Sequence, residues 1–116
     1  MEYQIKFMEA YNAAMVHFTG SVNVNDEPAM IEMVKEQLIP KNWKKVIFNI
    51  SQLDYIDSAG MGSFLTARSI LNNNGGELVL LSPSPQIFKI LMLAGFNKIF
   101  LIYDTEAEAV KGLSQI

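Results

Sequence analysis

The chain has 116 residues, half of them hydrophobic and 18% charged, which suits one folded domain with a core of its own. Its formal net charge of −3 argues against nucleic-acid binding, and the lack of cysteine excludes disulfides and cysteine-ligated zinc. No hydrophobic run approaches the ~20 residues that span a bilayer, and the first residues contain no hydrophobic signal core. We therefore expect a single cytoplasmic domain over residues 1–116, without membrane insertion or a nucleic-acid partner.

Hydrophobic patterning in the first half of the sequence predicts two strands, a helix and a third strand. Hydrophobic residues roughly alternate over 3–8 and again over 13–20, and the short connection between these runs favours an antiparallel hairpin. A helix is expected over 28–39, because a proline suits its first turn and a second proline stops it. The nearly continuous hydrophobic centre of 44–50 is typical of a strand covered on both faces.

The second half of the sequence alternates helices with strands. Residues from about 58 to 73 predict a helix, and its buried side is expected to hold Met61, Phe64, Leu65 and Leu71. A buried strand is expected over 77–81 and a last strand over 98–103. Ser84 fits the N-cap of a helix between them, and the Thr-x-x-Glu sequence at 105–108 fits the capping box of a terminal helix.

This order of elements predicts an α/β domain with a mixed, mostly parallel sheet of about five strands and four helices. Single helices between successive strands are right for parallel crossovers. Ligand sites in such sheets lie off the carboxyl ends of the strands. The sequence YIDSAGMG at 55–62 follows the strand at 44–50, and the loop after Gly20 follows another strand. We therefore expect the functional site at these two segments.

The sequence offers little for a catalytic centre. His17 is the only histidine, and strand alternation places it on the face of Met15 and Thr19, as a surface or edge-strand residue. A histidine metal cluster is thus excluded, and no Ser-His-Asp triad is expected. The segment DSAGMG at 57–62 is neither a Gly-x-Ser-x-Gly elbow nor a Walker loop. We therefore expect a binding protein without enzymatic activity, metal or cofactor.

A hydroxyl group stands where the strand pattern gives way to a helical one. Ser58 falls on the first turn of the expected helix, where backbone N–H groups lack partners and the helix dipole favours negative charge. Gly60 and Gly62 remove side chains from the same turn, which lets a bulky partner approach. A phosphate on Ser58 would stand beside Asp57, add roughly −1.5 to −2 units of charge and repel an acidic or hydrophobic partner. The turn is therefore a candidate binding switch.

A purely structural interpretation of the same turn stays open. In that interpretation Asp57 or Ser58 serves only as the N-cap of the helix, and the glycines only let the helix pack close to the sheet. The methionines at helical positions, such as Met30 and Met61, are most simply core filling or partly exposed surface.

Residues 46–67 (VIFNISQLDYIDSAGMGSFLTA) resemble the signature of the STAS-domain family, the bacterial anti-sigma factor antagonists. That signature is a strand, a hydrophobic-Asp-Ser-Ser/Thr/Ala-Gly-hydrophobic-Gly turn, and then a helix. Residues 75–110 are similar to the second half of the family, and Gly20 matches the glycine that ends its second strand. The resemblance covers almost the whole chain and implies a single STAS-like domain.

The resemblance implies a phosphorylation-switched interaction with a partner. The phosphorylated serine of the family corresponds to Ser58, and the matching residues of the turn and of the neighbouring loop are Asp57, Ala59, Gly60, Met61, Gly62 and Asn23. The implied partners are an anti-sigma factor that is also a serine kinase of the histidine-kinase-like ATPase fold, and a PP2C-type phosphatase. An unphosphorylated antagonist holds the anti-sigma factor and frees the sigma factor, so transcription is regulated by partner switching.

Two residues depart from the commonest form of the family, and other functions stay open. Many members have Asp where this chain has Asn23, which keeps the hydrogen-bonding shape and loses the charge; Ala59 takes a position that is often Ser or Thr. Some members scaffold stress-signalling assemblies or accompany lipid transporters. A constitutive interaction subunit of such an assembly is therefore the alternative. A small enzyme or nucleotide-binding domain is a third hypothesis, against which the absence of a phosphate loop, metal ligands and a usable histidine argues.

Overall fold

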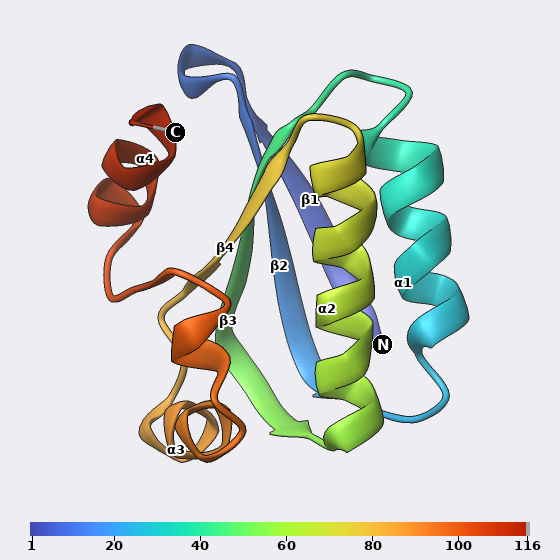
Figure 1. Ribbon diagram of the computed structural model, residues 1–116, viewed down its shortest axis with the longest axis vertical. Coiled ribbons are helices and arrows are strands. Elements are labelled where there is room, and N and C mark those ends of the chain that lie inside the picture. Colours follow the sequence, from blue (N-terminus) through green and yellow to red (C-terminus); the bar gives the residue numbers. More distant parts are fainter. Residues whose placement is uncertain (116) are drawn as a thin grey trace.

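The computed structural model describes residues 1–115, and within them the fold is built on a five-stranded sheet (Figure 1). The strands lie in the sheet in their sequence order: β1 Glu2–Met8, β2 Ala13–Val22, β3 Lys45–Ile56, β4 Glu77–Leu81 and β5 Ile102–Tyr103. β1 is antiparallel to β2, and each later pair of neighbours is parallel. The expected mixed, mostly parallel sheet is confirmed.

Four α-helices accompany the sheet in the described part of the chain. They are α1 Glu27–Met33, α2 Ser58–Asn73, α3 Pro85–Leu93 and α4 Glu106–Ser114. The end of α1 continues as a π-helical turn, η2 Val34–Leu38, and two short 3₁₀ turns are η1 Glu9–Tyr11 and η3 Phe96–Lys98. α1 and α2 lie side by side on one face of the sheet, whereas α4 lies on the other (Figure 1).

The main core lies between the sheet and the helices α1 and α2. Three phenylalanines meet there, with ring centroids 4.8 Å apart for Phe18 and Phe48 and 5.3 Å apart for Phe48 and Phe64. All three side chains are fully buried, so they contribute strongly to the packing of β2, β3 and α2. A second, smaller cluster joins Met15 and Ile47 of the sheet to α4.

β3 is longer than the sequence predicts. The expected strand ends at residue 50, but β3 runs on to Ile56 because Gln52, Leu53, Tyr55 and Ile56 still pair with β2, with two irregularities in the register. Leu53 and Ile56 are also buried in the core, although polar residues stand between them. The turn that follows β3 therefore begins at residue 57, directly after the last paired residue of the strand.

β5 is shorter than predicted. Only Ile102–Tyr103 of the expected strand 98–103 pairs with β4. The N–H groups of Ile99 and Phe100 instead return to the carbonyl of Phe96, which makes a helical turn. Phe96 and Phe100 stack with centroids 5.3 Å apart and are both buried, so side-chain packing favours that turn over an extended strand.

The inner face of α2 also differs from the prediction. Its buried residues are Gly60, Ser63, Phe64, Ala67 and Leu71. Leu65, which was expected to be buried, is exposed, and Met61 is half-buried. The buried residues recur every three or four positions on one face of the helix, and Leu65, one residue after Phe64, lies about 100° around the helix from that residue.

Candidate functional site

Because β2 and β3 are parallel, the loops that follow them lie together at the carboxyl ends of the two strands. Val22 and Ile56 are the last paired residues of the two strands. Residues 23–26, here called the β2 loop, follow Val22, and residues 57–60, here called the α2 turn, follow Ile56. Both lie at the lower end of the molecule in Figure 1. The structure thus joins the two segments at which function was expected.

Asp57 connects the α2 turn to the β2 loop through its carboxylate. Its Oδ1 accepts a hydrogen bond from the N–H of Gly60 (2.7 Å), which makes Asp57 the N-cap of α2. Its Oδ2 accepts a hydrogen bond from the N–H of Val24 (3.1 Å). One half-buried carboxylate therefore fixes both the start of the helix and the position of the neighbouring loop.

Ser58 and Ala59 are the exposed residues of the α2 turn. Because Asp57 is the cap, the hydroxyl of Ser58 is not used for capping, and its side chain makes no hydrogen bond within residues 1–115. The first N–H groups of a helix have no intrahelical partner, and the helix dipole is positive there. The hydroxyl therefore faces solvent in a place that tolerates an anion.

The two glycines of the motif have different surroundings. A Cβ on Gly60 would overlap the carbonyl oxygen of Val22, so Gly60 lets α2 approach β2. Gly60 is buried, and the expectation that it bares the surface for a partner is wrong. A Cβ on Gly62 would have no atom within 4 Å. Of the two glycines, therefore, only Gly62 lies beside open space.

Asn23 lies half-buried in the β2 loop, and its side chain bonds to its own segment. Its Oδ1 accepts a hydrogen bond from the N–H of Asn25 (3.0 Å), and its Nδ2 donates one to Oγ of Ser21 (3.2 Å). The loop reaches the α2 turn through the N–H of Val24, not through this amide. Asn23 therefore shapes the loop beside Ser58 without a hydrogen bond between the two residues in the described part of the chain.

Asp26 closes the β2 loop, a role that was not predicted from the sequence. Its side chain is buried, with Oδ2 accepting from the N–H of Asn23 (2.7 Å) and Oδ1 from the α-amino group of Met1 (2.9 Å). Burial alone would raise the pKa of Asp26, but the Asn23 N–H and the Met1 ammonium outweigh burial and hold it below the usual value. An Asp just before a helix signals an N-cap, yet Asp26 makes no capping hydrogen bond.

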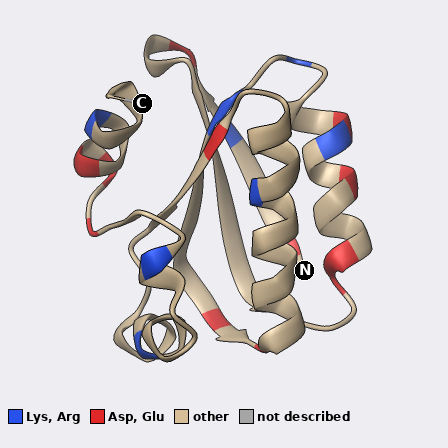
Figure 2. Cartoon of the chain, viewed as in Figure 1, with Lys and Arg blue, Asp and Glu red and all other residues tan. Residues whose placement is uncertain are grey.

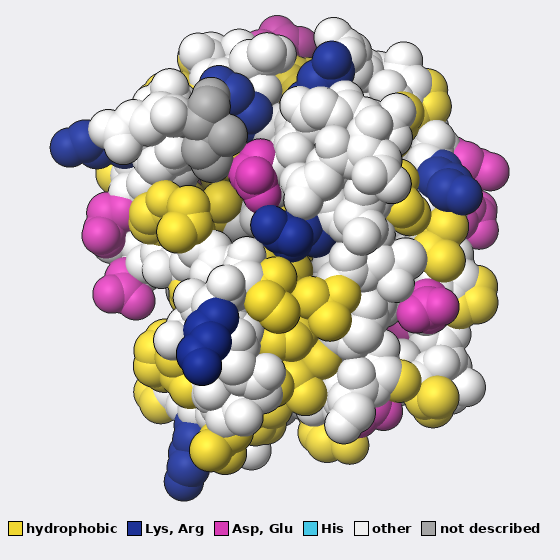
Figure 3. Space-filling view, viewed as in Figure 1, with side chains coloured by type: hydrophobic (Ala, Val, Ile, Leu, Met, Phe, Trp, Pro, Cys, Tyr) yellow, Lys and Arg dark blue, Asp and Glu magenta, His cyan; other side chains and the backbone are white. Residues whose placement is uncertain are grey.

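The surface next to Ser58 carries exposed hydrophobic side chains. Val24 in the β2 loop is 66% exposed, and Tyr55 near the end of β3 is 54% exposed. On α2, half-buried Met61 is followed one turn later by exposed Leu65. More hydrophobic side chains gather beside α2 over α3 and the segment before β5, where Phe88, Leu93, Ile99 and Leu101 are exposed (Figure 3).

The segments that form this end of the molecule are acidic. Neither 20–34 nor 46–67 contains a Lys or Arg, whereas together they hold five acidic residues, Asp26, Glu27, Glu32, Asp54 and Asp57. Figure 2 accordingly shows red but no blue at the lower ends of β3 and α2. A negative group at Ser58 would therefore find no basic partner on these segments.

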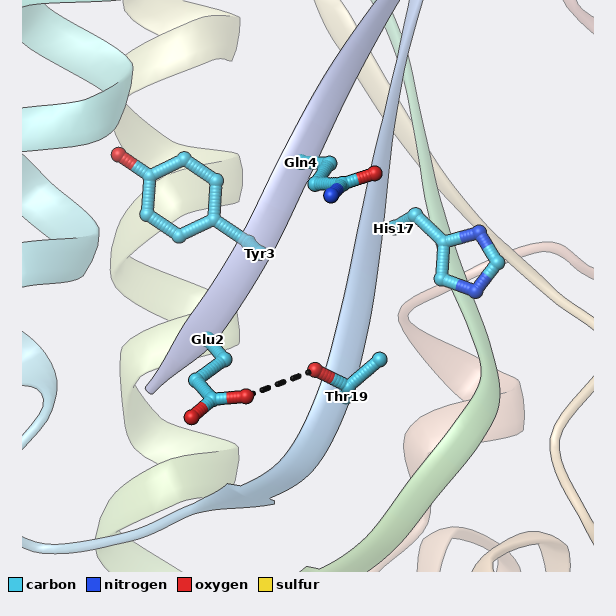
Figure 4. A pocket seen from close by; sticks show the side chains of 5 residues that line it. All are labelled: Glu2, Tyr3, Gln4, His17 and Thr19. Atoms are coloured by element: carbon cyan, nitrogen blue, oxygen red, sulfur yellow. Dashed lines mark hydrogen bonds between the residues drawn. The ribbon is translucent and has the colours of Figure 1, made fainter.

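A shallow polar hollow of about 380 Å³ lies elsewhere, on the open face of β1 and β2 (Figure 4). Glu2, Gln4, His17 and Thr19 point toward it, while the ring of Tyr3 points to the other side of the sheet. β2 lies between β1 and β3, so His17 is a half-buried surface residue and not an edge-strand residue.

Within residues 1–115 no three His, Asp or Glu side chains are grouped as metal ligands. No helix in the same range is long and hydrophobic enough to cross a membrane.

The sequence matches the model of the STAS domain over residues 4–109, which is most of the chain. The chain belongs to the STAS domain family. One relative is the anti-sigma F factor antagonist of Paenibacillus polymyxa, which is 23% identical over 116 residues and covers 100% of this chain and 99% of its own length.

Two solved structures share the fold. A candidate anti-sigma factor antagonist from Thermotoga maritima has a TM-score of 0.85 at 21% identity, covering 97% of this chain and 94% of that one. The Bacillus cell fate determinant SpoIIAA in its phosphorylated form has a TM-score of 0.69 at 22% identity, covering 95% and 97%. At these identities the likeness concerns the fold, and the STAS architecture expected from the sequence is confirmed.

Proposed function

We propose that this STAS domain is an anti-sigma factor antagonist that binds its partner through the α2 turn and releases it when Ser58 is phosphorylated. The observation that carries the proposal is the exposed hydroxyl of Ser58, which makes no hydrogen bond within residues 1–115 and stands next to an aspartate that already caps the helix. Hydrophobic side chains of Val24, Tyr55 and Leu65 supply the contact area around it. The domain acts by binding in the cytoplasm and not by catalysis.

The proposed switch works by electrostatics and desolvation. The partner kinase transfers the γ-phosphoryl group of ATP to Oγ of Ser58, the hydroxyl proton is lost and ADP leaves; a phosphatase of the PP2C type later hydrolyses the ester with water. The phosphate brings roughly −1.5 to −2 units of charge to a surface that a bound partner must desolvate. Because neighbouring segments hold no Lys or Arg, an intramolecular ion pair with them cannot neutralise this charge.

The relatives supply the partner class. The Paenibacillus polymyxa relative is named as an antagonist of an anti-sigma factor, and SpoIIAA exists in a phosphorylated form. By extension we propose an anti-sigma factor as the partner of this chain; the family resemblance of the sequence adds the expectation of serine kinase activity and a histidine-kinase-like ATPase fold. Binding of the antagonist would free a sigma factor for transcription.

A constitutive interaction subunit is the second candidate, and the position of Asn23 favours it. The family resemblance implies Asp at this position in many members, but here an uncharged amide bonds to Asn25 in the β2 loop and to Ser21 at the end of β2. A kinase that relies on a carboxylate at that place would phosphorylate Ser58 poorly. The domain would then hold its partner at all times.

Mass spectrometry of the protein from its own cells, with and without phosphatase treatment, separates the two candidates. A phosphoryl group on Ser58 supports the switch, whereas its absence under both growth and stress supports the constitutive subunit. Binding then gives the mechanism: Ser58→Asp is expected to abolish capture of the anti-sigma kinase and Ser58→Ala to retain it. Ser69→Asp is the matched control, because it adds a carboxylate at an exposed serine of the same helix, away from the turn.

A further inference from the structure

β1 is an edge strand with the properties of a self-association surface. It pairs with β2 over seven residues without a register shift, and nothing in the described chain pairs with its outer side. It contains neither proline nor glycine, and Lys6 is its only lysine. An unprotected strand of this length presents a row of free N–H and C=O groups to another strand.

The side chains of β1 alternate in a way that can complement themselves. Glu2, Gln4 and Lys6 are exposed on the open face of the sheet, the first two beside the hollow of Figure 4. Neither Glu2 nor Lys6 has an ion-pair partner within residues 1–115. Glu2 and Lys6 carry opposite charges on the same face of the strand. When a second copy of the strand pairs with it antiparallel, each charge can lie opposite the complementary charge of that copy.

We infer that β1 pairs antiparallel with β1 of a second copy of this chain, around a two-fold axis at Gln4. Glu2 then lies opposite Lys6 of the second copy, and Lys6 lies opposite its Glu2. On the helix side of the sheet, Tyr3 of each copy lies opposite Ile5 of the other. The two sheets become one continuous sheet, and the edge is no longer free.

The charge pattern selects this register over its neighbours. A two-fold axis at Ile5 would place Glu2 opposite Met8, which is buried in the monomer, and would leave both charges without partners. An axis at Tyr3 would pair only the first residues of the strand. The axis at Gln4 alone satisfies both charges and keeps most of β1 paired.

The inferred dimer leaves both candidate binding sites accessible. Each α2 turn lies at the carboxyl ends of β2 and β3, and the antiparallel arrangement directs the two turns to opposite ends of the joined sheet. The dimer does not depend on phosphorylation of Ser58, so the two proposals can fail separately.

Sedimentation of the full chain from micromolar to near-millimolar concentration tests the inference. The wild type is expected to dimerise, and Glu2→Lys or Lys6→Glu to weaken the dimer at least about tenfold, because each places like charges opposite each other twice per dimer. An equimolar mixture of the two variants, and the double variant carrying both changes, should recover the wild-type affinity. Circular dichroism should show all of these chains folded, since both side chains are exposed.

Lys98→Glu is the matched control, because it makes the same charge change near the opposite edge of the sheet and should leave dimerisation unaltered. A wild type that stays monomeric at every concentration would overturn the inference. So would a Lys98→Glu chain as impaired as Lys6→Glu, which would point to net charge instead of register. Failure of the mixture and of the double variant to recover affinity would equally exclude this pairing.

Discussion

Helices α2 and α3 start with the same kind of hydrogen bond but use their serines differently. At α3, Ser84 is itself the N-cap and accepts a hydrogen bond from the N–H of Ile87 (3.2 Å). At α2, Asp57 accepts the equivalent bond from the N–H of Gly60, and the side chain of Ser58 makes no hydrogen bond in the described part of the chain. An aspartate cap therefore keeps the adjacent hydroxyl available for chemistry, whereas a serine cap consumes it.

The α2 start depends on a second feature that α3 lacks, the close approach of Gly60 to β2. Gly60→Ala places a methyl group against the carbonyl of Val22 and is expected to lower the free energy of unfolding by about 2–3 kcal/mol. Gly62→Ala, in open space, should be neutral or stabilise by up to about 1 kcal/mol. Urea unfolding of the two variants measures both, and equal effects would contradict the separate roles of the glycines.

Removing the aspartate cap should cost more than removing a cap that serves the helix alone. Asp57→Ala deprives both Gly60 and Val24 of their acceptor, so we expect a loss of about 1–2 kcal/mol. The β2 loop should also lose protection, and amide hydrogen exchange at Val24 would report it. Unchanged exchange there would show that the loop does not need this carboxylate.

The two serines provide the sharpest test of the comparison. Ser84→Ala is expected to destabilise by about 1 kcal/mol because a helix loses its cap. Ser58→Ala should change stability by less than about 0.5 kcal/mol, since the hydroxyl has no internal partner among residues 1–115. Thermal unfolding of both proteins decides it, and a cost at Ser58 as large as that at Ser84 would mean that Ser58 shares the capping.

The smallest effect concerns the β2 loop and pH. The pKa of Asp26 is lower in the folded protein than its usual value, so its contribution to stability is fully present above that value. The contribution is lost as the pH falls below about 3.8 and through the folded pKa. Urea unfolding of the wild type and Asp26→Asn between pH 6 and pH 3, a range of ~3 units, should therefore show a steeper acid loss in the wild type. Parallel curves would exclude a role for this carboxylate.

Most of the fold was predicted from features of short stretches of sequence. The caps at Ser84 and Thr105, the helix beginning at Ser58 and the alternation of helices with strands are all properties of short stretches of sequence, and each is confirmed. The Asp-Ser-x-Gly turn was equally visible. Its place at the carboxyl ends of two parallel strands followed from the order of elements.

What the sequence did not reveal depends on residues far apart in the chain. The length of β3 is decided by pairing with β2, and the need for Gly60 by the carbonyl of Val22. The ion pair of Asp26 with the amine of Met1 spans 25 residues. Asp54 and Tyr55 interrupt the hydrophobic pattern between Leu53 and Ile56, so this stretch alone does not show that the strand continues there.

Because the strands lie in the sheet in the order in which they occur in the sequence, no strand has to be inserted between two that are already paired. Each new pairing closes only the segment between consecutive strands, which keeps the loop-closure entropy of every step low. A chain emerging from the ribosome can therefore pair β1 with β2 first and then add one strand with its helix at a time. The growing edge moves steadily away from β1, and α4 is the last of the described elements to be added, on the second face of the sheet (Figure 1).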